Sequence, residues 1–383
     1  MTSPPLRVLG FESYDTGSHR AVRELISAHS RHRWTWLTRP GRGWKWRMRL
    51  AAVELVEIAA ASGRFDEPID AIMATSLMGV ADLRAMLPAR LRGIPIILYM
   101  HENQAAYPSS SHPKVDSTRD VHFAITNLTS VLAADLVVWN SRWNRDSFME
   151  AMDSILKRAN AVDLRGWREK AEARSTVIWP PAEAPPMDTA GDGGDGKVLR
   201  NTERVVWPHR WEHDKGPDEL LDLATQYSDT LDLRWTILGE QFPDVPPALR
   251  EFETRLAART DHFGFEPDRR QYWRHLASAG WVLSTARHDF FGLAVVEAIA
   301  AGALPLLPHR LSYPELLPAA AHARHLYHST RELEERLEQL LASPLSGAGE
   351  ISAAVRHRFA WPRRAADVDD ALAAVARSRT SDR

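Results

Sequence analysis

Short apolar runs alternate with amphipathic segments in the first half of the chain. Five runs have the length and composition of buried strands: Leu6–Phe11, Ala71–Thr75, Ile94–Met100, Leu136–Trp139 and Thr176–Trp179. The segments between them predict helices over Ser18–Ser27, Thr118–Ala133 and Trp143–Lys157. Strands that alternate with helices pair in parallel, so this half of the chain predicts a doubly wound α/β sheet.

The pattern stops at a Pro- and Gly-rich segment and then restarts. Residues 184–200 bury too little apolar surface to offset the entropy of ordering them, so we expect an exposed linker there. Further strands are predicted over Glu203–Trp207, Leu233–Leu238, His262–Phe265, Trp281–Thr285 and Leu304–Leu307. Further helices are predicted over Pro217–Tyr227, Pro246–Ala257, Asp268–Ala277, Leu293–Ala301, from the capping box at Ser329 to Leu341, and near Arg363–Ala376.

We therefore expect two Rossmann-like α/β domains. The N-terminal domain covers residues 1–183, and the C-terminal domain covers residues 201–362. A final helix and tail occupy residues 363–383. Ligands of such sheets bind outside the carboxyl ends of the strands, so the site is expected in the cleft between the domains.

Composition removes several classes of function. The chain has 48 basic and 50 acidic residues, and a net charge of −2 gives no global attraction to nucleic acid or to an anionic membrane. The absence of cysteine excludes disulfides, thiolate zinc sites and cysteine nucleophiles. Neither a secretory signal nor an apolar run long enough to span a bilayer is present, so we expect a cytoplasmic protein.

The first strand of the second domain leads into a basic turn. Arg210 and Lys215 follow that strand and precede the helix that begins at Pro217. Both cations suit a diphosphate, since Arg offers a planar fork and Lys a point charge. The alternative is two solvated surface cations, but basic residues at a helix start oppose the helix dipole unless an anion lies there.

A second candidate site lies where the strand ending at Thr285 gives way to a helix. Phe291, Gly292 and Leu293 form the start of that helix, whose free backbone N–H groups are suited to an anion. Asp289 and Glu297 flank the turn and can accept hydrogen bonds from sugar hydroxyls. The alternative is that both acids are ordinary surface charges near a helix start.

Two turns of the first domain carry further candidates. His101, Glu102 and Asn103 end a buried strand, where reactive or substrate-positioning side chains commonly lie. Gly17 and Ser18, in the turn after the first strand, are weaker candidates for phosphate contact because the full glycine-rich fingerprint is absent. The alternative for His101 is a structural histidine.

Residues 31–49 contain seven basic residues and four tryptophans. Exposed aromatic rings stack on unpaired bases and cations contact phosphates, so a single-stranded RNA surface is one interpretation. The other places the tryptophans in the core, because Trp34/Trp36 and Trp44/Trp46 each alternate like one face of a strand. The RNA-contact candidates here are Arg33, Trp34, Arg42, Trp44, Lys45 and Trp46.

Metal-binding patterns are weak in this sequence. The only Asp-x-Asp, Asp367 to Asp369, falls in the predicted last helix, away from any strand end. His209 and His213 lack the H-E-x-x-H arrangement. We therefore expect no metal and no bound cofactor.

The motifs resemble those of a known enzyme family. Arg210, Lys215 and the Asp289–Glu297 segment look like the retaining GT-B glycosyltransferases of family four. More narrowly, the chain from about residue 7 to residue 362 resembles the tRNA-queuosine mannosyltransferase family. The stretches that carry this resemblance are GSH (17–19), HENQ (101–104), VWPHRWEHDK (206–215), LGE-x-F-x-DVP (238–246), FFG (290–292) and YPE (313–315).

The resemblance implies a GT-B fold and transfer of mannose from GDP-mannose to the cyclopentenediol of queuosine at a tRNA wobble position, with retention of the α configuration. By matching motif, Arg210 and Lys215 would stabilise the leaving diphosphate and Glu297 would hold the ribose hydroxyls. Asp289 would contact the donor sugar, and His101 would lie beside the reacting carbon. Glu102 and Asn103 would contribute to the acceptor side, and no metal would be required.

Two alternatives stay open at this point. The first is a family-four transferase that acts on a lipid or a small molecule, for which an amphipathic membrane-facing helix would be expected near Trp34–Arg49. The second is a catalytically silent RNA-binding protein. The combination of Arg210, Lys215, Asp289 and Glu297 argues against the second. Donor identity, the acceptor tRNA and the oligomeric state do not follow from the sequence.

Overall fold

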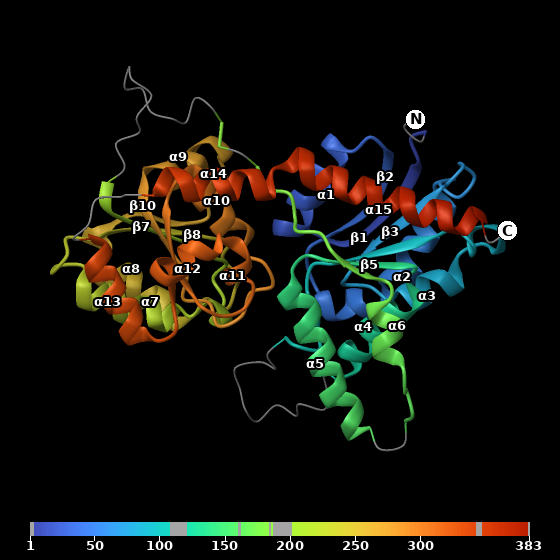
Figure 1. Cartoon of the computed structure of the whole chain (residues 1–383), viewed down its shortest axis with the longest axis horizontal. Coiled ribbons are helices and arrows are strands. Elements are labelled where there is room, and N and C mark those ends of the chain that lie inside the picture. The colour runs from blue at the N-terminus through green and yellow to red at the C-terminus, as the bar shows by residue number, and fades with distance from the viewer. Residues whose placement is uncertain are drawn as a thin grey trace. The chain divides into compact units, whose positions relative to one another are not determined.

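A computed structural model describes residues 4–107, 121–159, 162–183, 185–186, 201–341 and 347–381. The chain divides into two compact units (Figure 1). Unit 1 contains Met1–Pro181 and Trp361–Arg383, and unit 2 contains Ala182–Ala360. The C-terminal helix thus groups with the first unit rather than standing apart. Most of the expected linker, residues 184–200, lies outside the described residues.

Unit 1 is built on a six-stranded parallel sheet with the order β2-β1-β3-β4-β5-β6. Its strands are β1 (Arg7–Asp15), β2 (Arg33–Pro40), β3 (Ala71–Thr75), β4 (Ile96–Met100), β5 (Leu136–Trp139) and β6 (Ser175–Val177). Every residue of the central strands β3 and β4 is buried. Helices cover both faces of such a sheet, which explains why these strands read as continuous apolar runs.

The helices of unit 1 form two layers around this sheet. They are α1 (Gly17–His29), α2 (Trp44–Ala61), α3 (Val80–Met86), α4 (Val121–Ala133), α5 (Arg142–Arg158), α6 (Trp167–Glu172) and α15 (Trp361–Ser381). One core cluster joins the sheet to α2 through α6, and the other joins it to α1 and α15. Figure 1 shows α15, in red, alongside α1. The last helix of the chain therefore completes the core of the first unit.

Unit 2 repeats the architecture with a second six-stranded parallel sheet, ordered β12-β11-β10-β7-β8-β9. The strands are β7 (Asn201–Pro208), β8 (Arg234–Leu238), β9 (Thr260–Gly264), β10 (Ala279–Leu283), β11 (Leu304–Pro308) and β12 (Leu326–Tyr327). The helices are α7 (Pro217–Tyr227), α8 (Pro247–Arg255), α9 (Arg269–Ser278), α10 (Leu293–Ala301), α11 (Tyr313–Leu316), α12 (Ala319–His325), α13 (Thr330–Leu341) and α14 (Ala348–Phe359). The predicted pair of doubly wound sheets is confirmed.

The region rich in tryptophan and arginine differs in part from its strand-like pattern. Trp34 and Trp36 do share one face of a strand, β2, and their rings stack at 5.1 Å. Trp44 and Trp46, in contrast, open the helix α2, so the strand-like interpretation of this second pair was wrong. Buried positions at helical spacing decide the outcome, and they are Met48, Ala51, Ala52, Leu55, Val56 and Ala59.

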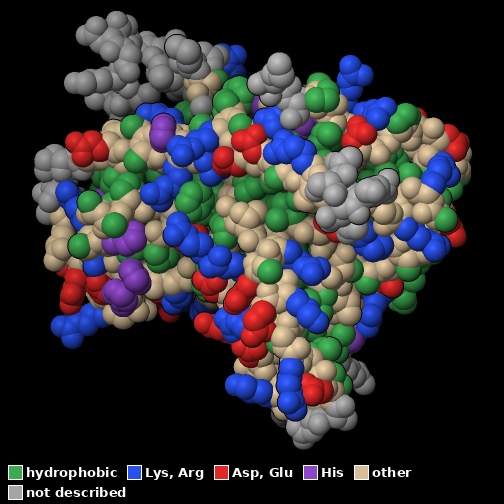
Figure 2. Space-filling view, turned by 45° about the vertical axis from the view of Figure 1, so that its right-hand side comes forward, with side chains coloured by type: hydrophobic (Ala, Val, Ile, Leu, Met, Phe, Trp, Pro, Cys, Tyr) green, Lys and Arg blue, Asp and Glu red, His purple; other side chains and the backbone are tan. Residues whose placement is uncertain are grey.

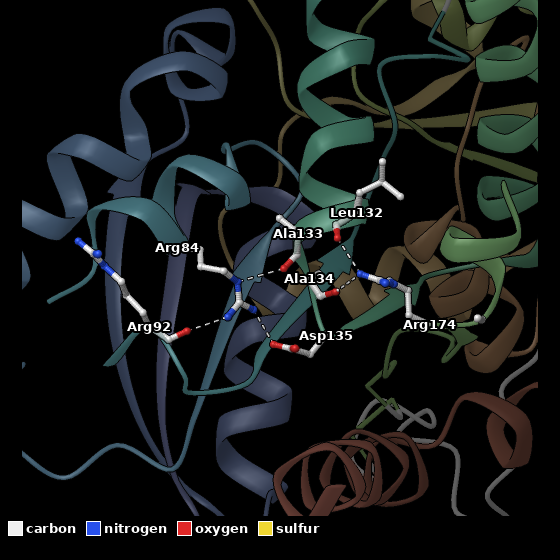
Figure 3. Close-up of a pocket in the computed structure, with 8 residues that line it drawn as sticks. Arg84, Arg92, Leu132, Ala133, Ala134, Asp135 and Arg174 are labelled. Carbon is white, nitrogen blue, oxygen red and sulfur yellow. Dashed lines mark hydrogen bonds and ion pairs between the residues drawn. The ribbon is translucent and has the colours of Figure 1, made fainter. Parts of the chain in front are cut away.

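A cavity of about 680 Å³ lies at the C-terminal end of α4 (Figure 3). Arg84 donates to the carbonyl of Ala133 at 3.1 Å, and Arg174 donates to the carbonyl of Ala134 at 3.0 Å. Cations at a helix C-terminus satisfy its last carbonyls and complement its dipole. Since Asp135 in this cavity directly precedes β5, the cavity lies at the amino ends of the strands, away from the edge where ligands of such sheets bind.

Among the described residues, no helix is both long and apolar enough to traverse a bilayer.

Asp369 of α15 ties the last helix to the loop after α1. Its carboxylate accepts hydrogen bonds from the Ser30 hydroxyl at 2.5 Å and from the Arg31 N–H at 2.8 Å, and the Asp369 side chain is buried. We predict that Asp369→Ala lowers the free energy of unfolding by ~2 kcal/mol, because both donors lose their acceptor. Urea denaturation measures the change. Asp370→Ala is the matched control, since Asp370 pairs with Arg31 at the surface, and an equal loss in both variants would contradict the prediction.

Candidate functional site

A buried histidine stands between two carboxylates at the carboxyl edge of the first sheet. His19 lies in the first turn of α1, and its Nδ1 is 3.2 Å from both carboxylate oxygens of Glu12. On the other side its Nε2 is 3.0 Å from Oε2 of Glu102. Glu102 is fixed in turn by the Ser76 hydroxyl, which donates to Oε1 at 2.8 Å. Both ring nitrogens of His19 therefore face an acceptor.

This arrangement fixes the charge of His19. Burial by itself would lower its pKa, but the charges of Glu12 and Glu102 and their hydrogen bonds raise the pKa of His19 to about 10. Burial likewise works against ionisation of Glu12, but the charge of His19 and the hydrogen bonds from His19 and the Tyr14 N–H together outweigh it, so the pKa of Glu12 lies below its usual range. At neutral pH the group is a buried imidazolium held by two carboxylates.

His101, which follows β4, lies directly against this group. Its ring stacks on His19 with centroids 3.9 Å apart and contacts the ring of Tyr99 at 4.7 Å. Burial, and then the positive charge of His19, hold the pKa of His101 well below its usual range. The sequence singled out His101, and the structure places it as a neutral imidazole with a ring nitrogen able to accept a proton or a hydrogen bond.

The other candidates of unit 1 are divided between structural and exposed positions. Glu102 binds His19, whereas Asn103 is buried and donates to Oδ1 of Asn144 at 2.8 Å, which fixes the loop after β4. Gly17 has a φ of 48°, the left-handed conformation that favours glycine, and it begins α1. Ser18 is exposed in the first turn of that helix.

In unit 2 a buried lysine occupies the carboxyl edge of the sheet. Lys215 follows β7, and its Nζ donates to the carbonyl of His288 at 2.7 Å. The same nitrogen is 3.2 Å from Oδ2 of Asp214 and 3.6 Å from Oδ2 of Asp289. Its side chain thus faces the turn that leads into α10. Gly216 permits this approach, because a Cβ at that position would lie 2.3 Å from the Thr285 carbonyl oxygen.

The Asp289 carboxylate contacts several groups around the turn before α10. It accepts from the Phe291 N–H at 3.2 Å and from the Tyr313 hydroxyl at 3.3 Å. Burial disfavours the charged form, but Lys215, the hydrogen bond from the Phe291 N–H and Arg210 act together against it, so the pKa of Asp289 is lowered and the group is ionised. Gly292 is the N-cap of α10 with a φ of 87°, and Leu293 is the first residue of the helix. The predicted helix start is therefore next to the lysine.

Arg210 is less constrained than Lys215. Its Nη2 is 3.0 Å from Oε2 of Glu212, and its side chain is partly exposed. The charge of Arg210 also contributes to the lowered pKa of Asp289, but less than that of Lys215. His209 is buried nearby, and burial lowers its pKa to about 4, so it is neutral. The two predicted cations thus share one acidic neighbour, with Lys215 buried and Arg210 at the surface.

Glu297, one turn into α10, is buried and already bound on both oxygens. The Tyr272 hydroxyl donates to Oε2 at 2.7 Å, and the guanidinium of Arg269 pairs with Oε1. Arg269 also pairs with Glu183 at 2.7 Å. Arg269 and Tyr272 escaped the sequence analysis because they lie in the predicted helix of α9, with nothing in the local pattern to connect them to Glu297. Glu12 could have been found from the sequence, because it is an acidic residue that directly follows the apolar run Leu6–Phe11.

Only part of the predicted RNA surface presents aromatic rings. Trp34 packs against Trp36 beside the core, and Trp44 packs against Phe123 at 5.1 Å. The side chain of Trp46, by contrast, is 73% exposed. Lys45 lies over the Trp44 ring at 5.4 Å, while Arg33 and Arg42 are exposed. On the face seen in Figure 2, the described basic side chains are scattered rather than gathered into one continuous surface.

Comparisons with known proteins agree with this architecture. Residues 7–182 match the family described as tRNA-queuosine alpha-mannosyltransferase N-terminal. The tRNA-queuosine alpha-mannosyltransferase of Drosophila melanogaster is 28% identical over 343 residues, which cover 88% of this chain and 87% of that protein.

Solved structures with the same fold include two glycosyltransferases of the GT-B class. Anabaena HepE in complex with UDP has a TM-score of 0.65 at 17% identity, covering 96% of this chain and 100% of that one. The sucrose-phosphate synthase of Thermosynechococcus elongatus has a TM-score of 0.67 at 15% identity, covering 95% of this chain and 98% of that one. These likenesses establish the GT-B fold.

The charge of His19 gives a pH-dependent contribution to stability. The pKa of His19 is raised from 6.5 to about 10 in the folded chain, so the stabilisation is complete below the unfolded value and is lost as pH rises through the folded value. We predict that the difference in unfolding free energy between the native chain and His19→Gln shrinks steadily from pH ~7 to ~10. Urea denaturation at a series of pH values measures it, and a difference independent of pH would show that His19 is uncharged.

Proposed function

We infer the reaction from family membership, since this chain belongs to the tRNA-queuosine alpha-mannosyltransferase family and is a glycosyltransferase. We propose that it transfers mannose from GDP-mannose to the cyclopentenediol of queuosine at the wobble position of tRNA, with retention of the α configuration. The observation that carries the proposal is the buried Lys215, which lies beside the start of α10 and is coupled to Asp289. Cytoplasmic action and independence from metal belong to the same proposal.

The donor diphosphate would bind at the start of α10. Negative charge grows on this group as the glycosidic bond breaks, and Lys215, Arg210 and the free N–H groups of the helix start are positive groups close to this turn. Such groups stabilise the transition state best when they are held in place beforehand. Its three contacts hold the Lys215 ammonium in place before the donor binds, whereas Arg210 is partly exposed and less constrained.

Glu297 would hold the ribose of the nucleotide. Its carboxylate is fixed by Arg269 and Tyr272, and a carboxylate oxygen has lone pairs for more than one donor. Asp289, held ionised beside Tyr313, would accept from hydroxyls of the mannose. The sugar would then lie between the diphosphate and the acceptor.

His101 would serve the acceptor side as a neutral hydrogen-bond acceptor beside the reacting carbon. In the proposed step, the bond between the anomeric carbon and the phosphate oxygen breaks while the acceptor oxygen bonds to that carbon on the same face. The proton of the acceptor hydroxyl passes to the departing phosphate oxygen. All bonds and protons of this step are accounted for without a protein nucleophile, a metal or a redox partner.

The proposal is tested by mass spectrometry of nucleosides. The full-length protein is incubated with GDP-mannose and queuosine-containing tRNA, and the tRNA is then digested. A gain of one hexose on queuosine is expected, and tRNA lacking queuosine is the control. Consumption of donor without modified queuosine would favour transfer to a lipid or small molecule instead. Binding of tRNA without donor consumption would favour the silent RNA-binding alternative. Parallel reactions with other nucleotide sugars test the donor.

Lys215→Ala is predicted to lower turnover by roughly two orders of magnitude at saturating GDP-mannose, because one preorganised positive group is lost from the leaving diphosphate. Steady-state kinetics measures turnover, and thermal unfolding checks that the variant is folded. Lys170→Ala, which removes an exposed lysine from α6, is the control and should leave turnover unchanged. Full turnover in a folded Lys215→Ala protein would exclude the role assigned to this residue.

Trp46 is the one tryptophan of the Trp34–Trp46 segment whose ring is largely exposed, and we propose that it stacks on an unpaired base of the tRNA. Trp46→Ala is predicted to weaken tRNA binding about tenfold or more, as expected for the loss of one stacked base, with Trp46→Phe retaining most of the affinity. Filter binding at fixed salt measures it. Met86→Ala removes another exposed apolar side chain of unit 1, and the same loss in that variant would argue against stacking.

A further inference from the structure

We propose that unit 2 carries a zinc site formed by His262, Glu266 and His275, separate from the groups assigned to sugar transfer. One nitrogen of each histidine and one carboxylate oxygen of Glu266 lie within 4.8 Å of one another. His262 belongs to β9, Glu266 to the following loop, and His275 to α9. Residues from a strand, a loop and a helix thus place three potential ligands around one point.

The spacing suits a shared ion better than a hydrogen bond. Nε2 of His275 is 3.7 Å from Oε2 of Glu266, beyond the usual range of a hydrogen bond. Ligands bound to zinc at 2.0–2.2 Å in a tetrahedral arrangement are about 3.4 Å apart. The two imidazole rings have centroids 4.5 Å apart and are inclined at 40°. Small side-chain shifts would therefore bring the three ligands to bonding distance.

The ligands are oriented by contacts of their own. Oε1 of Glu266 accepts from the Asp268 N–H at 2.9 Å, which leaves Oε2 as the oxygen near His275. Nε2 of His262 is 3.3 Å from the Gly264 carbonyl, and an N–H···O bond there would leave a lone pair on Nδ1. Backbone partners of this kind, which fix the tautomer and direction of a ligand, are a regular feature of protein metal sites.

The neighbouring Asp261 is not free to act as a fourth ligand. Both its oxygens are engaged, Oδ1 by Arg234 and Oδ2 by Arg204 at 3.1 Å. Two histidines and one glutamate with a free position form a ligand set that zinc accepts, with water or another ligand as the fourth group. Imidazole nitrogens favour zinc over magnesium, which prefers oxygen ligands in an octahedral arrangement.

Such an ion would link β9 to α9. Arg269 and Tyr272, which hold Glu297, are carried by the same helix as His275. Zinc bound only by the folded protein stabilises the folded state by mass action, and here the stabilisation would act on the connection that positions Arg269 and Tyr272. The site itself does not depend on the reaction proposed above, and binding can be measured without any substrate.

The experiment is a calorimetric titration of the full-length, chelator-treated protein with Zn²⁺ near neutral pH. One equivalent is expected to bind, and His262→Ala and His275→Ala should each weaken the affinity at least tenfold, about 1.4 kcal/mol. Bound Co²⁺ provides a second readout, because ligation by these side chains gives visible absorption that both variants should lose. Mg²⁺ should give no site-specific heat.

His309→Ala is the matched control. His309 also belongs to a stacked histidine pair of unit 2, with His328 at 4.4 Å, and it should not affect zinc binding. Absence of zinc binding overturns the proposal, as does zinc binding of unchanged affinity in both ligand variants. The latter result would direct attention to the buried set Glu12, His19 and His101, whose ligand atoms lie equally close together. Circular dichroism confirms that each variant is folded.

Discussion

The arrangement of unit 2 depends on one buried ammonium group. Lys215 is surrounded by two carboxylates and a carbonyl, and it is the largest favourable influence on the ionisation of Asp289. Asp289 in turn anchors the Phe291 N–H and the Tyr313 hydroxyl at the start of α10. Removing the cation would leave two acids close together with no buried counter-charge, which is a costly state in a site of low dielectric constant.

Unit 1 also contains a buried cation between two carboxylates, but there the cation is a histidine. There the buried cation is the imidazolium of His19, it follows the first strand of the sheet, and its partners are Glu12 and Glu102. Each unit thus places a cation between two carboxylates at the carboxyl edge of its sheet. The consequence differs, because the charge of His19 adds to the burial that lowers the pKa of His101, whereas Lys215 lies beside a helix start suited to an anion.

The sequence predicts the two sheets because strands such as β3 and β4 in unit 1 and β10 and β11 in unit 2 are buried throughout and therefore read as uninterrupted apolar runs. Turn residues after those strands, such as His101 and Asp289, can be found for the same reason. The partners of Glu297 could not be found, since Arg269 and Tyr272 look like ordinary polar positions of α9 until the fold brings α9 beside α10. The alternation of Trp44 and Trp46 wrongly indicated a strand, because two residues are too few to distinguish the period of a strand from that of a helix.

The charges around Lys215 make the start of α10 as important to the proposed diphosphate site as the side chains of Lys215 and Arg210. Lys215 and Arg210 carry two positive charges, and Glu212, Asp214 and Asp289 carry three negative charges, so these side chains together have no surplus of positive charge. Binding of the proposed diphosphate would require either release of Arg210 from Glu212, which the partial exposure of Arg210 permits, or attraction from the N–H groups that begin α10. In the proposed site, Lys215 would supply a cation of fixed position, and Arg210 and the start of α10 would supply the surplus of positive potential.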